Sequence, residues 1–68
     1  MVRAIVSYLF TDSPKSDTVD LKYPTWDSFE RGIDALNRRV KNGEIKFYNM
    51  TGVDENGNYR SSSFNRMR

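Results

Sequence analysis

The sequence contains no cysteine and no histidine among its 68 residues. Without cysteine no disulfide bond can stabilise the chain, and without either residue type the usual ligand sets for zinc and haem are missing. The serines also lack the histidine or cysteine partners on which nucleophilic catalysis commonly depends. We therefore expect a protein that is not an enzyme and that holds no cofactor and no metal.

Long apolar runs are also missing. No stretch approaches the 18 or so residues that a membrane-spanning helix requires, and the apolar start of the chain, residues 1–10, is too short and interrupted for a signal peptide. We expect a soluble cytoplasmic protein. The length suits one small domain over residues 1–68, with a frayed tail at residues 65–68.

Lysine could serve as a base, but nothing places one beside a serine, so paired acidic residues are the candidates for acid–base chemistry or oxygen ligation of a metal. Asp17 with Asp20 and Asp54 with Glu55 are the closest pairs, and Asp12 lies nearby in the chain. They lie in or beside predicted turns, where aspartate is common for backbone reasons, and no EF-hand pattern is present. The four glycines are isolated from one another, so a phosphate-binding loop is not indicated either.

The longest periodic segment is residues 25–43. Trp26, Phe29, Ile33, Leu36 and Val40 recur at spacings of three and four, which is typical of an amphipathic helix with one apolar face. Thr25 favours an N-cap at the start of the segment, and Asp27 with Glu30 three residues later offers an alternative cap. The segment ends in an Asn-Gly pair at 42–43 that favours helix termination.

Four segments have the composition or alternation of strands: residues 2–10, 18–23, 44–53 and 59–64. We expect a bulge near Gly52 and a type I′ turn at Asn56-Gly57 between the last two strands. The serine-rich last strand is expected at an edge of the sheet.

The predicted order is β-β-α-β-β, an α+β fold with one antiparallel four-stranded sheet and a single helix packed on one face. The predicted core residues are Val6, Tyr8, Val19, Leu21, Trp26, Phe29, Ile33, Leu36, Val40, Ile45, Phe47 and Phe64.

A helix on one side leaves the other face of the sheet open to a partner. We expect that face to carry basic and aromatic side chains, a combination enriched at protein-binding hot spots. The candidate partner-binding residues are Lys46, Tyr48, Met50, Tyr59 and Arg60. The expected function is a non-enzymatic protein-interaction module that binds a protein or a nucleoprotein complex, as a monomer or as a homodimer paired through the serine-rich edge strand.

Nucleic acid is the alternative partner. Residues 35–68 hold seven basic and three acidic residues, whereas residues 1–34 hold four basic and six acidic residues. Basic residues interleaved with aromatic residues on a sheet would suit single-stranded RNA or DNA. The candidate residues are Arg38, Arg39, Lys46, Arg60, Arg66 and Arg68.

In length, lack of cysteine and element order, the chain resembles the small proteins that phages use against their hosts, including RNA polymerase inhibitors and anti-CRISPR proteins. The resemblance involves no motif and transfers no residue role. It implies an inhibitor or regulator that binds a host protein or nucleoprotein complex in the host cytoplasm. Many such inhibitors are acidic mimics of nucleic acid, whereas the second half of this chain is basic.

Overall fold

The computed structural model describes residues 1–65 and contains one helix and four strands. The elements in chain order are β1 (Val2–Phe10), β2 (Asp17–Tyr23), α1 (Trp26–Lys41), β3 (Ile45–Val53) and β4 (Tyr59–Asn65). The predicted α+β class and β-β-α-β-β order are confirmed. Asn65, expected in a frayed tail, ends β4, and the rest of that tail lies outside the described residues.

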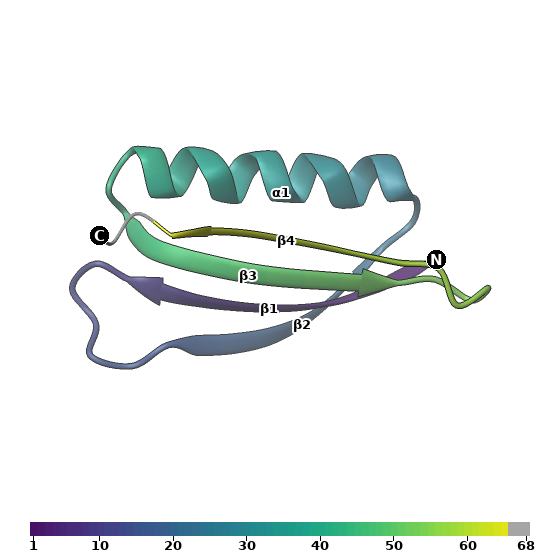
Figure 1. Ribbon diagram of the computed structural model, residues 1–68, viewed down its shortest axis with the longest axis horizontal. Coiled ribbons are helices and arrows are strands. Elements are labelled where there is room, and N and C mark those ends of the chain that lie inside the picture. The colour runs from purple at the N-terminus through teal and green to yellow at the C-terminus, as the bar shows by residue number, and fades with distance from the viewer. Residues whose placement is uncertain (66–68) are drawn as a thin grey trace.

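The four strands form one antiparallel sheet in the order β2-β1-β3-β4, and α1 lies against one face of it (Figure 1). The two strands at the edges are therefore β2 and β4, which confirms the edge position of the serine-rich strand. The other face of the sheet is covered by no element of residues 1–65. This one-sided cover makes the uncovered face the natural place to search for a binding site.

Local signals set the limits of α1 as predicted. The Thr25 hydroxyl accepts a hydrogen bond from the Ser28 amide at 3.2 Å, which caps the first turn. At the other end Gly43 has φ +82°, and the amides of Gly43 and Glu44 donate to carbonyls of the last turn. That pair of bonds is a Schellman motif. The helix is neither long nor apolar enough to span a membrane, and residues 1–65 contain no other helix.

A β-bulge lies near the start of β3. Phe10 of β1 pairs with Ile45, and Leu9 pairs with Phe47, so Lys46 is an extra residue without a counterpart. An extra residue reverses the alternation of the side chains that follow it. Ile45 therefore faces the helix, Phe47 does not, and Tyr48 does.

The bulge expected at Gly52 is wrong, because Gly52 sits in regular register between Ala4 and Arg60. Its lack of a side chain serves close packing instead. A Cβ built on Gly52 would lie 2.4 Å from a ring carbon of Phe29, far inside van der Waals contact. Glycine at this position lets the fully buried Phe29 ring lie directly on β3.

The core lies between α1 and the central strands. It consists of Val2, Ala4, Val6, Phe29, Ile33, Val40, Ile45, Tyr48 and Met50. Five of these were predicted, and five further predicted residues pack against the core from partly buried positions: Tyr8, Val19, Trp26, Leu36 and Phe64. Two predicted core residues are misplaced. Phe47 lies on the uncovered face, and Leu21 lies on the helix side of an edge strand, where it stays 37% exposed.

Candidate functional site

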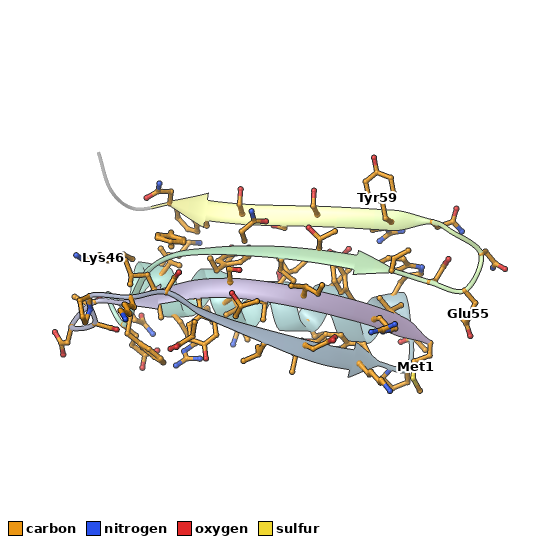
Figure 2. All side chains as sticks on the ribbon, turned by 90° about the horizontal axis from the view of Figure 1, so that it is seen from below. Met1, Lys46, Glu55 and Tyr59 are labelled. Atoms are coloured by element: carbon orange, nitrogen blue, oxygen red, sulfur yellow. The ribbon has the colours of Figure 1, made fainter. Side chains whose placement is uncertain are left out.

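The uncovered face of the sheet presents alternate residues from all four strands, because directly opposite residues share a face. The strand register assigns to it Arg3, Ile5, Ser7 and Leu9 of β1, Thr18, Asp20 and Lys22 of β2, Phe47, Asn49, Thr51 and Val53 of β3, and Tyr59, Ser61, Ser63 and Asn65 of β4. Figure 2 looks onto this face, with α1 behind the sheet.

Three exposed apolar residues occupy neighbouring register positions at one end of the sheet, and the Tyr59 side chain points outward past the edge of β4 (Figure 2). Tyr59 pairs with Val53 across β3 and β4, and Ile5 lies diagonally from Val53 on β1. They are 73%, 43% and 57% exposed, respectively. We call Ile5, Val53 and Tyr59 the apolar patch. Arg3 lies beside it, and a hollow of about 260 Å³ opens between Arg3, Ile5 and Val53.

The middle of the uncovered face carries short polar side chains. It is formed by hydroxyl and amide side chains, namely Ser7, Thr18, Asn49, Thr51, Ser61 and Ser63. The hydroxyls of Ser7 and Thr18 lie 3.1 Å apart and bond across β1 and β2. Leu9 and Phe47 are partly buried at the far end. The apolar patch is therefore separated from the other apolar side chains of this face by a band of short polar groups.

The loop between β3 and β4 borders the apolar patch and is held by Asp54. One carboxylate oxygen of Asp54 accepts hydrogen bonds from the amides of Asn56 (2.9 Å) and Asn58 (3.0 Å), and the other accepts one from the Trp26 indole at 3.0 Å. The indole bond is the largest cause that lowers the pKa of Asp54. The loop is thereby fixed to the start of α1.

The type I′ turn expected at Asn56-Gly57 is wrong. Type I′ requires a positive φ at both central residues, and among the described residues no residue other than glycine has one. Instead the Gly57 amide donates to the Asp54 carbonyl at 3.1 Å, and Gly57 follows with φ +85°. The Asp54 side chain binds the two asparagine amides, which favours this longer loop over a two-residue turn.

Arg60 lies on the helix side of β4, since its neighbour Tyr59 occupies the uncovered face. Its guanidinium group pairs with Glu30 at 2.9 Å and lies 4.9 Å from the centre of the Trp26 ring. A hollow of about 600 Å³ lies beside this cluster and the hairpin; it is lined by Trp26, Asp54, Gly57, Asn58, Tyr59 and Arg60. The contacts of Arg60 are with its own chain, and Tyr59 of the apolar patch borders the same hollow.

The five residues predicted to bind a partner do not form one site. Tyr48 and Met50 are 1% and 0% exposed, so their expected position on the open face is wrong. The physical reason is the bulge at Lys46, which reverses the facing of β3. Figure 2 shows Lys46 at the opposite end of the sheet from Tyr59. Of the five, only Tyr59 is exposed on the uncovered face.

The basic residues proposed for nucleic acid lie toward both ends of the molecule. Arg39 packs over the Phe10 ring and pairs with Glu44 near the C-terminal end of α1, whereas Arg60 lies near its N-terminal end. Arg38 is exposed on the helix. Arg66 and Arg68 lie outside the described residues. Within residues 1–65, Arg38, Arg39 and Lys46 lie toward the end where α1 passes into β3, and Arg60 lies toward the other end.

The sequence analysis missed two members of the apolar patch, Ile5 and Val53, and the flanking Arg3 and Lys22. In β1 the alternation of side chains places Arg3 and Ile5 on the face away from the core residues Ala4 and Val6, so their exposure could be predicted from the sequence. The face on which Val53 lies could not be predicted in the same way, because it depends on the bulge at Lys46. Among residues 1–65 no group of acidic residues is arranged to hold a metal ion.

Comparison with known proteins gives no relative. No protein-family model matches the chain, and no curated protein or solved structure matches it. The case for a function therefore rests on the uncovered face itself.

Proposed function

We propose that the chain is a non-enzymatic protein-interaction module that binds its partner through the apolar patch. The observation that supports this proposal is the exposure of Ile5, Val53 and Tyr59 at neighbouring register positions, at one end of a sheet with a face that no element of residues 1–65 covers. Contiguous exposed apolar side chains, especially a tyrosine with an arginine beside it, are typical of the centre of a protein interface. The polar band across the middle of the face would serve as a rim.

The phage-type role belongs to the same proposal. A small inhibitor acts by occupying a surface of a host protein, and it needs a binding face but no catalytic group. The patch at one end of the sheet, bordered by the fixed β3–β4 loop, meets that need. This part of the proposal rests on size and element order alone.

Nucleic acid is the second, less favoured candidate for the partner. A stacking platform needs several exposed aromatic rings beside cations. On the uncovered face Tyr59 lies at one end and the partly buried Phe47 at the other. Because the two rings lie at opposite ends of the face, the arrangement favours a protein surface over a single strand.

A capture experiment from bacterial lysate tests the proposal. The tagged chain is compared with an Ile5→Ser/Tyr59→Ser variant, which removes two members of the apolar patch, and with an Asp34→Ala control on the exposed side of α1. We expect a discrete protein band with the wild type and the control, present with and without nuclease, and lost with the patch variant. Circular dichroism checks that all three proteins are folded.

Two results would count against the proposal. A band that the patch variant retains would place the contact elsewhere on the molecule. Loss of all bound material on nuclease treatment would favour the nucleic-acid alternative, and affinity for single-stranded RNA should then fall steeply as the salt concentration rises.

A further inference from the structure

The two edges of the sheet differ in their charges. An edge strand presents unpaired backbone N–H and C=O groups, which can pair with a strand of another chain. β4 carries one charge, Arg60, and this residue is bound to Glu30 of its own chain. β2 carries Asp17, Asp20 and Lys22, and the last two flank Leu21 symmetrically. Charges on an edge normally oppose pairing, but this arrangement is complementary to itself.

We propose that two copies of this chain pair through β2, antiparallel, with Leu21 opposite Leu21 of the second copy. In this register Asp20 lies opposite Lys22 of the second copy, and Lys22 lies opposite Asp20 of the second copy. Both ion pairs fall on the uncovered face, because opposite residues share a face. Val19 and Tyr23 meet in the same reciprocal way on the helix side. The product is one continuous eight-stranded sheet.

Charge selects this register over its neighbours. Moving the two-fold axis to Asp20 sets two carboxylates directly opposite each other. Moving it to Val19 sets Leu21 opposite Asp17 and Asp20 opposite Thr18, so both ion pairs are lost. Of these registers, only the one centred on Leu21 places Asp20 and Lys22 each opposite the residue of opposite charge in the second copy.

The helix side of β2 has an apolar surface that this pairing would extend into the second copy. A groove of about 310 Å³ runs between α1 and β2, and its lining is mostly apolar: Val6, Tyr8, Val19, Leu21, Tyr23, Gly32, Ala35, Leu36 and Arg39. Leu21 is 37% exposed there although it faces the helix side. A two-fold axis through Leu21, perpendicular to the sheet, would bring the same residues of the second copy beside this groove.

Within one chain the charge of Lys22 is poorly compensated. Lys22 lies directly opposite Arg3 on the uncovered face, and Arg3 makes its ion pair with Asp20 at 3.6 Å. No ion pair of Lys22 is found within residues 1–65. Like charges placed directly opposite one another are destabilising. Asp20 of the second copy would supply the missing negative charge.

Charge reversal tests this interface. The mass of the wild type is followed from micromolar to millimolar concentration by light scattering and sedimentation equilibrium, and a monomer–dimer equilibrium is expected. Asp20→Lys sets Lys against Lys22, and Lys22→Asp sets Asp against Asp20, so each variant replaces two attractive pairs by two repulsive ones. We expect the Kd of each to rise about tenfold or more. An equimolar mixture should dimerise again, since each pair in the mixed dimer has opposite charges.

Lys22→Asp also separates dimerisation from folding. It places an acidic residue opposite Arg3, so the monomer should fold at least as well as the wild type. Asp34→Lys makes the same charge change as Asp20→Lys on the exposed side of α1 and should leave the Kd unchanged. Ser61→Lys/Ser63→Lys opposes pairing through β4 and should also leave it unchanged.

Three results would overturn the proposal. The wild type could be a monomer at every concentration. Its dimer could survive both charge reversals, or fail to reform in the mixture. The β4 variant could abolish the dimer, which would assign the interface to the other edge. The two proposals can fail separately, because the apolar patch variant leaves Asp20 and Lys22 in place and the charge variants leave Ile5, Val53 and Tyr59 in place.

Discussion

Replacing Tyr48 is the sharpest test of how β3 faces. A regular strand would put Tyr48 on the uncovered face, whereas the bulge at Lys46 puts it in the core, 1% exposed. Its hydroxyl donates to the Asn37 side chain at 2.6 Å and lies 3.0 Å from the Ser62 hydroxyl. Tyr48 thereby joins α1, β3 and β4 at one point.

The expected loss of stability follows from those contacts. Tyr48→Ala empties the space of a buried aromatic side chain, which costs about 3–5 kcal/mol. A domain of this length has a free energy of unfolding of roughly 3–10 kcal/mol in total, so this variant should be largely unfolded or close to it. Tyr48→Phe keeps the ring and leaves Asn37 and Ser62 without the hydroxyl. We expect a loss of about 1–2 kcal/mol, or a fall in Tm of about 4–16 °C.

Thermal and urea unfolding, followed by circular dichroism, measure both effects. Tyr59→Ala and Tyr59→Phe are the matched controls, because Tyr59 is the same residue type in the same sheet but 73% exposed. Both controls should change the free energy of unfolding by no more than about 0.5 kcal/mol. Equal, small effects at the two tyrosines would refute the bulge and return Tyr48 to the surface.

Three further changes test other parts of the fold. Gly52→Ala should lower the free energy of unfolding by about 1–3 kcal/mol, because the added Cβ would strike the Phe29 ring; thermal unfolding would show it, and an unchanged Tm would contradict the close packing. Thr25→Ala removes the helix N-cap and should cost about 1 kcal/mol in urea unfolding, with Thr25→Ser as the control that keeps the cap. The pKa of Asp54 is lowered in the folded chain, chiefly by the Trp26 hydrogen bond, so its contribution to stability is present above its unfolded pKa of about 3.9 and is lost as pH falls through the lower, folded pKa. Urea unfolding of Asp54→Asn, followed by fluorescence of the single tryptophan, should therefore depend less on pH in the acid range than that of the wild type; identical profiles would show that Asp54 does not contribute.

The helix and the order of elements could be predicted because their signals are local. The spacing of apolar residues, the Thr25 cap and the Gly43 terminus each act within a few residues of the chain. The strands were recognisable from composition in the same way. Their neighbours in the sheet were not, because pairing between distant strands leaves no local signal.

The facing of β3 could not be predicted, because a bulge is defined by two strands together. The stretch from Ile45 to Tyr48 alternates acceptably in either register, and only the pairing with Leu9 and Phe10 shows that Lys46 is extra. Every site residue assigned from β3 inherited that uncertainty. β1 has no such break, so the exposure of Ile5 followed from sequence even though its place beside Tyr59 did not.

The central position of β1 and β3 also has a consequence for how the chain folds. The pairs β1–β2 and β3–β4 are hairpins between neighbouring segments, whereas β1–β3 joins residues as distant as Arg3 and Val53. Closing that long loop costs more chain entropy than closing either hairpin. Each hairpin can therefore form early, and the joining of the two halves across Ala4 and Gly52 is expected to limit the folding rate. Until that step the inner edges of both hairpins stay open to strands of other chains. We therefore expect wrong pairing between copies to be most frequent where many copies of the chain are synthesised close together.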